Sequence, residues 1–360
     1  MAKLELRGVT KTYGKTVGVA NIDLTVEDNE FFCIFGPPST GKSTILRLFL
    51  GLETPDSGEV CIGGEVVNGR LPAERDLAMV FQNLALFPHM TAGENLAFPL
   101  AERKTPKAER ERRVNEVADK LHIGPLLNKI PAHLSGGERQ RVAIGRALVR
   151  DSNALLMDES ISALDARLRE EMRVELKRLQ REMHRTLVYV THDQEEAMSV
   201  ADRLCIIRDG GIAQIGTPQE IYNAPNSRYV AEVIGAPPMN FIAGAIGEGG
   251  AFSADGLDLA LTFKTNGAAG PGDVGVRPED IVIEREAPGG HAVAATIYEV
   301  EPLGGFTVVA LSVGDSVLRA QITGQPQFTL GEPVHLSLAL DKCHLFASAD
   351  GARIATGATG

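Results

Sequence analysis

The chain has 360 residues, of which 44% are hydrophobic and 23% are charged, a composition typical of a soluble globular protein. This length exceeds what one hydrophobic core usually organises, so we expect two domains. The net charge of −11 argues against non-specific nucleic-acid binding, and no apolar run approaches the length of a membrane-spanning helix.

The N-terminal segment alternates apolar and polar residues over Leu4 to Val9 and over Val17 to Val26, which predicts two antiparallel strands. Its first seven residues hold no apolar signal-peptide segment, so we expect a cytoplasmic protein. Tyr13 lies between the strands, in a predicted loop. Its ring could stack on a nucleotide base, and a half-exposed surface tyrosine is the plainer alternative.

The stretch from Gly36 to Thr44 reads GPPSTGKST and matches the phosphate-binding pattern Gly-x4-Gly-Lys-[Ser/Thr]. An apolar run before it predicts a buried parallel strand, and helical spacing follows from Ile45 to Leu52. In that setting backbone N–H groups and a helix N-terminus bind phosphate, Lys42 reaches the terminal phosphates and Ser43 ligates Mg²⁺. The predicted contacts to a nucleoside triphosphate are Gly36, Ser39, Thr40, Gly41, Lys42, Ser43 and Thr44.

A second apolar run, Leu77 to Phe81, predicts a strand that ends at Gln82. An amide at the carboxyl end of a strand beside a phosphate loop can reach Mg²⁺ or an attacking water, and an ordinary polar strand end is the alternative. From residue 83 to about 150 the pattern becomes helical, which predicts an insertion in the core. Within it, the charged run from Lys104 to Arg113 favours a solvated helix face over a nucleic-acid site.

The sequence Leu134-Ser135-Gly136-Gly137-Glu138 precedes a predicted helix that runs through Arg139 to Arg150. Serine is a good N-cap, and the paired glycines leave backbone N–H groups bare at the helix start. This turn is therefore a second predicted anion site, although a Ser-Gly-Gly turn by itself is a weak signal.

An apolar strand from Ala154 ends in two carboxylates, Asp158 and Glu159. Asp158 can hold Mg²⁺, through water, and Glu159 can polarise the water that attacks a γ-phosphate, with plain surface acids as the alternative. Asp165 caps the helix after the turn that begins at Ser162. A further buried strand, Thr186 to Val190, leads to His192, which again falls where ligands bind in such sheets.

Together these motifs resemble the ATP-binding subunits of ABC transporters, whose six ordered motifs they match within residues 1–235. The resemblance implies a head-to-tail homodimer that holds each ATP between the phosphate loop of one chain and the signature turn, Leu134 to Glu138, of the other. It implies that Ser135 and Gly137 contact the γ-phosphate across the dimer. It also implies that Glu159 is the general base and that His192 and Gln82 sense the γ-phosphate and Mg²⁺. The implied ATP contacts outside the phosphate loop are Tyr13, Ser135, Gly136, Gly137, Glu138 and Asp165, and the implied Mg²⁺ ligands are Ser43, Gln82 and Asp158.

The C-terminal third narrows the resemblance to ATPases of carbohydrate importers of the maltose type. The segments 216–222 and 234–241 look like that group's hinge, and 274–280 and 300–304 look like its regulatory domain. Short alternating runs at 292–300, 306–312 and 317–322 predict strands of a separate β domain. We therefore expect an α/β P-loop core with an antiparallel β subdomain and a helical subdomain (about 83–150) over residues 1–235. A small all-β, OB-like domain is expected over 236–360.

Three departures from the family pattern stand out. Glu138 replaces the usual Gln, Ser160 the usual Pro, and Pro38-Ser39 the commoner Ser-Gly. Pro38 offers no N–H to a phosphate, and Glu138 could weaken dimer closure or form a new ion pair. Because Lys42, Glu159 and His192 are all present, we still expect an active ATPase.

The resemblance implies a peripheral protein on the cytoplasmic face of the inner membrane. Its implied partners are a second copy, two transmembrane permease subunits and, indirectly, a solute-binding protein; its implied cargo is a sugar or related polyol. Polyamine, sulfate or metal import is the alternative. A soluble ABC protein of ribosomes or DNA would usually carry two cassettes, and the acidic tail, with 6 Lys and Arg against 14 Asp and Glu after residue 235, also argues against it. A scaffold that binds ATP without turnover is opposed by Glu159 and His192.

Overall fold

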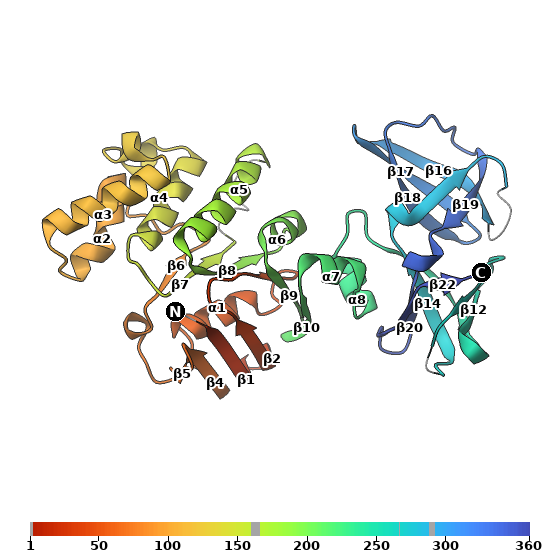
Figure 1. Ribbon diagram of the computed structural model, residues 1–360, viewed down its shortest axis with the longest axis horizontal. Coiled ribbons are helices and arrows are strands. Elements are labelled where there is room, and N and C mark those ends of the chain that lie inside the picture. Colours follow the sequence, from red (N-terminus) through yellow and green to blue (C-terminus); the bar gives the residue numbers. More distant parts are fainter. Residues whose placement is uncertain (1–2, 160–165, 266, 288–291) are drawn as a thin grey trace. The chain divides into compact units, whose positions relative to one another are not determined.

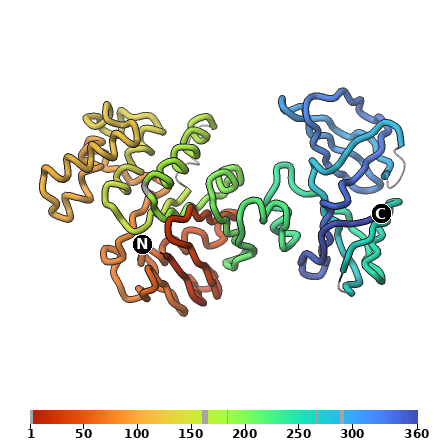
Figure 2. Tube along the Cα trace, in the orientation of Figure 1, coloured from red at the N-terminus to blue at the C-terminus, as the bar shows by residue number. Residues whose placement is uncertain are grey.

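The computed structural model describes residues 3–159, 166–265, 267–287 and 292–360. The chain divides into two compact units, Met1–Pro218 and Gln219–Gly360 (Figure 1). The trace in Figure 2 passes from red to green through the first unit and from green to blue through the second.

The first unit is built on a six-stranded sheet in the order β10-β9-β3-β8-β7-β6. The five strands from β9 to β6 run parallel, and every residue of β3 and β8 is buried. This burial on both faces explains why their sequences are continuously apolar rather than alternating. The strands are β3 (Phe31–Phe35), β6 (Leu77–Val80), β7 (Ala154–Asp158), β8 (Thr186–Thr191), β9 (Arg203–Arg208) and β10 (Gly211–Gly216).

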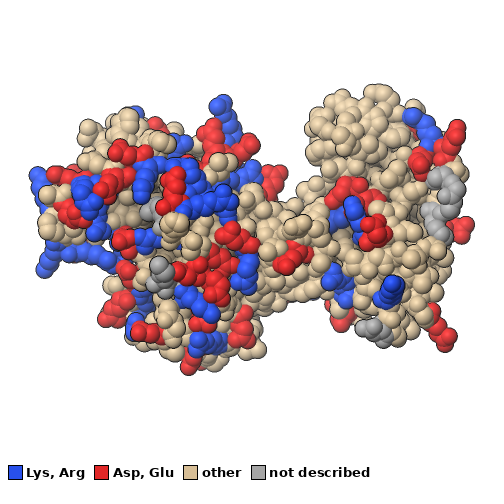
Figure 3. Space-filling view, in the orientation of Figure 1, with Lys and Arg blue, Asp and Glu red and all other residues tan. Residues whose placement is uncertain are grey.

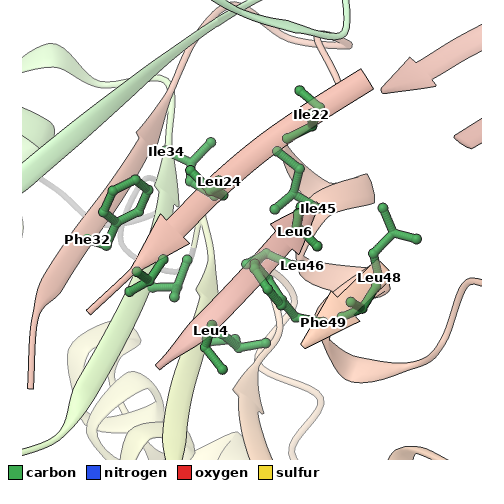
Figure 4. Close-up of a cluster of buried hydrophobic side chains, with 14 of the residues drawn as sticks. Leu4, Leu6, Ile22, Leu24, Phe32, Ile34, Ile45, Leu46, Leu48 and Phe49 are labelled. Carbon is green, nitrogen blue, oxygen red and sulfur yellow. The ribbon is translucent and has the colours of Figure 1, made fainter. Parts of the chain in front are cut away.

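A four-stranded antiparallel sheet, in the order β2-β1-β4-β5, shares its hydrophobic core with the parallel sheet and α1. Leu6 of β1 and Leu24 of β2 lie in one cluster with Ile34 of β3 and Phe49 of α1 (Figure 4). Helix α1 is thereby held between the two sheets, and its first residue follows the phosphate loop. The elements are β1 (Leu4–Tyr13), β2 (Thr16–Val26), β4 (Ser57–Ile62), β5 (Glu65–Val66) and α1 (Lys42–Leu50).

The segment predicted to be helical, 83–150, contains three α-helices that pack on one another and, through α4, on β6. On α3, Arg112 pairs with Glu109 and Glu116, as expected for a solvated helix face. Positive and negative side chains are interspersed over the face of the first unit in view in Figure 3, with no separate basic patch there. Besides α1, the α-helices in the described part of this unit are α2 (Ala92–Glu102), α3 (Lys107–Lys120), α4 (Gly136–Leu148), α5 (Ala166–Met183) and α6 (Gln194–Val200).

In its described residues the second unit contains two short α-helices and two antiparallel sheets. The sheets have the orders β21-β20-β14-β11-β12-β13-β22 and β15-β19-β16-β17-β18. The strands predicted at 292–300, 306–312 and 317–322 are β16, β17 and β18. The elements are α7 (Pro218–Asn223), α8 (Arg228–Val233), β11 (Asn240–Ile246), β12 (Ala251–Ala254), β13 (Ala260–Phe263), β14 (Gly270–Val276), β15 (Ile281–Glu284), β16 (Ala292–Pro302), β17 (Phe306–Val313), β18 (Ser316–Thr323), β19 (Pro333–Leu338), β20 (His344–Ala347), β21 (Arg353–Thr356) and β22 (Ala358–Thr359).

Arg277 explains why α7 and α8 belong to the second unit although the sequence predicts the boundary at residue 235. Its buried guanidinium donates to the carbonyl oxygen of Tyr222 at 2.8 Å and to that of Ile234. Both short helices are thereby tied to the β domain. Among the described residues, no helix has the length and apolar character needed to span a membrane.

Candidate active site

The phosphate loop joins β3 to α1 at the carboxyl edge of the parallel sheet. Gly41 has a φ of 102°, and a Cβ atom there would lie 2.2 Å from the carbonyl oxygen of Gly18. A Cβ atom at Gly36 would lie 2.8 Å from the carbonyl oxygen of Ile207. The loop backbone therefore approaches its neighbours so closely that both positions require glycine.

Lys42 is buried inside this loop. Its Nζ atom donates to the carbonyl oxygens of Gly36 and Pro37, both at 2.8 Å, and Thr40 Oγ1 donates to the same Pro37 oxygen at 2.9 Å. Burial lowers the pKa of Lys42, and the charge of Glu159 opposes that shift. A buried ammonium whose two hydrogen bonds at 2.8 Å go to neutral carbonyl groups, with its nearest carboxylate oxygen at 3.8 Å, fits a site for the phosphate oxygens of ATP.

Glu159 follows β7 directly and is the centre of a side-chain cluster, which we call the Glu159 cluster. Its Oε1 atom lies 3.2 Å from His192 Nδ1 and 3.8 Å from Lys42 Nζ, and its Oε2 atom accepts from Gln82 Nε2 at 3.3 Å. The backbone of Glu159 has a φ of 40°, a strained conformation that is commonest at functional sites. The structure thus brings together four residues that the sequence predicts from four separate motifs.

Ser43 and Asp158 lie side by side next to this cluster, and Ser43 Oγ donates to Asp158 Oδ1 at 3.1 Å. Burial raises the pKa of Asp158, and the hydrogen bond from Ser43 opposes the shift. A hydroxyl and a partly desolvated carboxylate are hard oxygen donors of the kind that Mg²⁺ prefers, so this pair fits the predicted ion. Gln82, the third predicted ligand, contacts Glu159 in this structure.

Tyr13 is the last residue of β1, paired with Thr16, and does not lie in a loop as predicted. The residue is 39% exposed. A Cβ atom on Gly18 would lie 2.9 Å from Tyr13 Cε2 and 3.3 Å from Thr44 Cγ2, so the ring lies beside the end of the phosphate loop. A half-exposed ring at this place is suited to stacking on the base of a bound nucleotide.

Asp56 holds the strand end that carries Tyr13, a role that the sequence does not predict. Its Oδ2 atom accepts from the backbone N and the Oγ1 of Thr12, both at 2.7 Å, and Oδ1 lies 3.5 Å from Lys11 Nζ. The bonds from Thr12 hold the pKa of Asp56 below its usual value. No motif marks this residue, because its partners Thr12 and Lys11 are 44 and 45 residues away in the chain.

The signature turn begins α4. The Ser135 hydroxyl accepts from the backbone N of Glu138 at 3.2 Å, and the Ser135 N–H donates to Glu138 Oε2 at 2.7 Å, which is a capping box. That second bond lowers the pKa of Glu138, which is therefore ionised at neutral pH. Gly137 packs closely on α5, since a Cβ atom there would lie 2.5 Å from Leu168 Cδ2 and would force that side chain to move.

Within the described residues, Ser135, Gly136, Gly137 and Glu138 belong to the helical layer and are not part of the Glu159 cluster. Asp165 and Ser160, together with the rest of the turn after Glu159, lie outside the residues that the structure describes.

A groove of about 710 Å³ opens between the strand end before Gln82 and the helical layer. Its walls are mostly apolar, and Arg146 also stabilises the turn after Gln82 by donating to the carbonyl oxygens of Leu84 and Ala85. The charged residues of the groove are three arginines and one glutamate. They are Arg103, Arg146, Arg150 and Glu102.

Comparison with protein families and with known proteins agrees with this geometry. The family model described as ABC transporter matches residues 19–162, that of the MalK OB fold domain matches residues 235–281, and that of the TOBE domain matches residues 274–346. These matches confirm the expected fold class, with an α/β cassette followed by an OB-like β domain.

The chain is 44% identical over 355 residues to the sn-glycerol-3-phosphate import ATP-binding protein UgpC 3 of Rhizobium etli, which covers 98% of this chain and 99% of that protein. It is 43% identical to the xylose/arabinose import ATP-binding protein XacJ of Haloferax volcanii, over 98% of this chain and 96% of that protein. Among solved structures, it resembles the dimeric post-hydrolysis state of the ATP-binding cassette MJ0796 bound to ADP and Pi. That match has 33% identity and a TM-score of 0.54, and it covers 60% of this chain and 98% of that one.

Three observations lead to one assignment. They are the sequence motifs, the Glu159 cluster, and a relative that is 44% identical over nearly the full length of both chains. The chain belongs to the ABC transporter family, as an ATP-binding subunit of the importer type.

Proposed function

We propose that this protein hydrolyses ATP to drive an ABC importer for a sugar or a related polyol. One observation supports the proposal that the protein hydrolyses ATP. Lys42, Gln82 and His192 all contact Glu159, next to the phosphate loop. A scaffold that only bound ATP would have no use for a carboxylate held in this position. Tyr13 and the phosphate-loop residues Gly36, Ser39, Thr40, Gly41 and Thr44 are proposed to bind the nucleotide.

In the proposed mechanism Glu159 accepts the proton of the attacking water, and His192 and Gln82 orient that carboxylate and sense the γ-phosphate. Lys42 exchanges its carbonyl acceptors for phosphate oxygens, so ATP binding releases the loop from its present hydrogen bonds. Ser43, Asp158 and Gln82 are proposed to hold Mg²⁺, which neutralises charge on the phosphate oxygens.

The signature turn is proposed to complete the site of a second copy. Ser135, Gly136 and Gly137 start a helix whose N-terminus favours an anion. Glu138 uses its carboxylate within its own capping box, which argues against its forming a new ion pair with another group. ABC cassettes work as dimers, and Asp165 is proposed, from the resemblance alone, to contact the nucleotide at this dimer interface.

ABC cassettes also work with transmembrane permease subunits, and the groove beside Gln82 is the proposed docking site for them. Its apolar walls suit a short amphipathic helix, and its arginines suit an acidic residue on that helix. Gln82 connects the groove wall to Glu159. A change in the nucleotide bound near Glu159 can therefore alter the conformation of the docking site. The protein is accordingly proposed to lie on the cytoplasmic face of the membrane and to work indirectly with a solute-binding protein.

The proposed cargo class follows from the relatives, whose names specify sn-glycerol-3-phosphate and xylose or arabinose. Polyamine, sulfate and metal import remain the alternatives. Co-purification of the complete membrane complex, followed by transport of labelled members of each class, distinguishes them.

The hydrolytic assignment is tested by Glu159→Gln. Removing the base should lower phosphate release by about 10²–10⁴-fold, while ATP and Mg²⁺ still drive dimer formation, so dimers accumulate in size-exclusion chromatography. Glu195→Gln, which changes an exposed carboxylate on α6, is the matched control and should retain wild-type turnover. Normal turnover by the Glu159 variant would refute the assignment of the base.

A further inference from the structure

Three basic side chains, one every four residues, join α5 to the start and end of α6. Because they recur at this spacing, Arg169, Arg173 and Lys177 lie on one face of α5. Their closest acidic partners are Asp193 at 2.9 Å, Glu195 at 3.2 Å and Asp202 at 2.5 Å, respectively. The last two pairs are at the surface, whereas the first lies over a buried carboxylate.

That carboxylate is Glu196, whose side chain is fully buried. Its Oε2 atom accepts from Tyr189 Oη at 2.5 Å and from Thr191 Oγ1 at 2.7 Å. Its Oε1 atom has no hydrogen-bond partner within the described ranges and lies 3.8 Å from Arg169 Nε. Burying a carboxylate with one unsatisfied oxygen is unfavourable, and well-packed apolar side chains often stabilise a fold at least as well. The arrangement therefore indicates a role other than stability.

Thr191 connects this carboxylate to the backbone on both sides of His192. Because the Thr191 hydroxyl donates its only proton to Glu196, its lone pairs are free to accept the N–H of Asp193, at 3.0 Å. Asp193 in turn caps α6 by accepting the backbone N–H of Glu196, also at 3.0 Å. The residues before and after His192 are thereby fixed, although the His192 side chain itself is 46% exposed and contacts Glu159.

We propose that Glu196, through Thr191 and Asp193, is a positioning residue that sets the His192 ring against Glu159. This inference rests on the proposed function, since it concerns the same hydrolysis. Glu196 does not contact the reacting atoms directly. Its loss should therefore lower the rate at which bound ATP is hydrolysed and leave the affinity for ATP unchanged. Small displacements of a catalytic group cost large factors in rate, on the order of 10²-fold per ångström.

The test removes the hydroxyl that links Glu196 to the His192 segment. Thr191→Val keeps the shape of the side chain, and we expect kcat for ATP hydrolysis to fall about tenfold with KM for ATP unchanged within twofold. Thr191→Ser restores the hydroxyl and should return kcat to within about twofold of wild type. Arg173→Ala removes an equivalent cation of α5 whose partner, Glu195, is exposed, and serves as the matched control with unchanged kcat and KM.

Glu196→Gln provides a second variant that retains an acceptor for both hydroxyl groups, and it should lower kcat less than Thr191→Val does. Wild-type kcat in Thr191→Val, or a loss in Thr191→Ser as large as that in Thr191→Val, overturns the proposal. Should Thr191→Val not fold, a Glu196→Gln variant that raises KM and lowers kcat to the same degree also overturns it. Failure of the proposed function is distinct, because the wild-type protein would then release no phosphate from ATP.

Discussion

Ser39 adopts a backbone conformation that side chains usually avoid. It is exposed in the phosphate loop with a φ of 65°, the left-handed region that favours glycine. A left-handed conformation costs a non-glycine residue roughly 1–2 kcal/mol, and this cost exceeds the extra chain entropy that glycine brings to the unfolded state. The phosphate loop therefore contains backbone strain, because Ser39 occupies a position whose conformation favours glycine.

We therefore predict that Ser39→Gly raises the free energy of unfolding by about 1 kcal/mol, measured by urea denaturation without nucleotide. Ser39→Ala keeps the strained backbone and should change the stability by less than about 0.5 kcal/mol. A destabilised glycine variant would show that the Ser39 side chain makes a contribution larger than the strain.

At the scale of elements, the end of β1 is held by one carboxylate from the turn before β4. Asp56 accepts three hydrogen bonds from Lys11 and Thr12, directly before Tyr13, and so determines where the aromatic ring lies beside Thr44. The position of Tyr13, the proposed stacking surface for the base, is thus set by pairing between distant segments, because Tyr13 itself makes no comparable polar contact with the phosphate loop among the described residues.

Asp56→Asn should raise KM for ATP several-fold, because the change weakens the bonds that hold the strand end before Tyr13. It should leave kcat unchanged, because Asp56 makes no contact with the Glu159 cluster. Steady-state phosphate release over a range of ATP concentrations measures both values. Asp23→Asn is the matched control, since Asp23 accepts from the backbone of Gly8 on the same strand, away from Tyr13. An equal rise in KM in both variants would contradict this prediction, because it would mean that any disturbance of β1 weakens ATP binding.

At the scale of the whole molecule, the structure and the family match divide the chain differently. The compact units separate after Pro218, whereas the OB fold match begins at residue 235, as the sequence-based boundary does. The segment between them packs with the second unit through Arg277 and through buried side chains such as Ile221, Val230 and Ile234. Burial of each such side chain contributes about 1.5–3 kcal/mol, partly offset by the entropy of ordering the helices.

We predict that a fragment of residues 219–360 unfolds in one cooperative transition and at a higher urea concentration than a fragment of residues 236–360. Circular dichroism during urea titration measures both midpoints, and the intact chain provides the reference for the second unit. Equal midpoints would place the folding boundary at residue 235 and would leave α7 and α8 without a stabilising role.

Much of the fold follows from local patterns. Continuous apolar runs predict the parallel strands β3, β7 and β8, because strands buried on both faces need no polar side, and alternation predicts β1, β2 and the strands of the C-terminal domain. Local patterns are less informative about the residue at which a strand ends. Tyr13 reads as a loop residue and is in fact paired with Thr16, because pairing with a neighbouring strand extends β1 beyond its alternating core.

The sequence by itself determined which residues are proposed to carry the chemistry, since Lys42, Gln82, Asp158, Glu159 and His192 all stand at the carboxyl ends of predicted strands or in the loop that follows one. Only the tertiary structure decided how they meet. It places three partners around the two oxygens of Glu159, ties Tyr13 to Asp56, and buries Glu196 beneath the His192 segment. Such contacts join residues far apart in the chain or on different elements, and hydrophobic patterning, which reports only the immediate surroundings of each residue, contains no information about them.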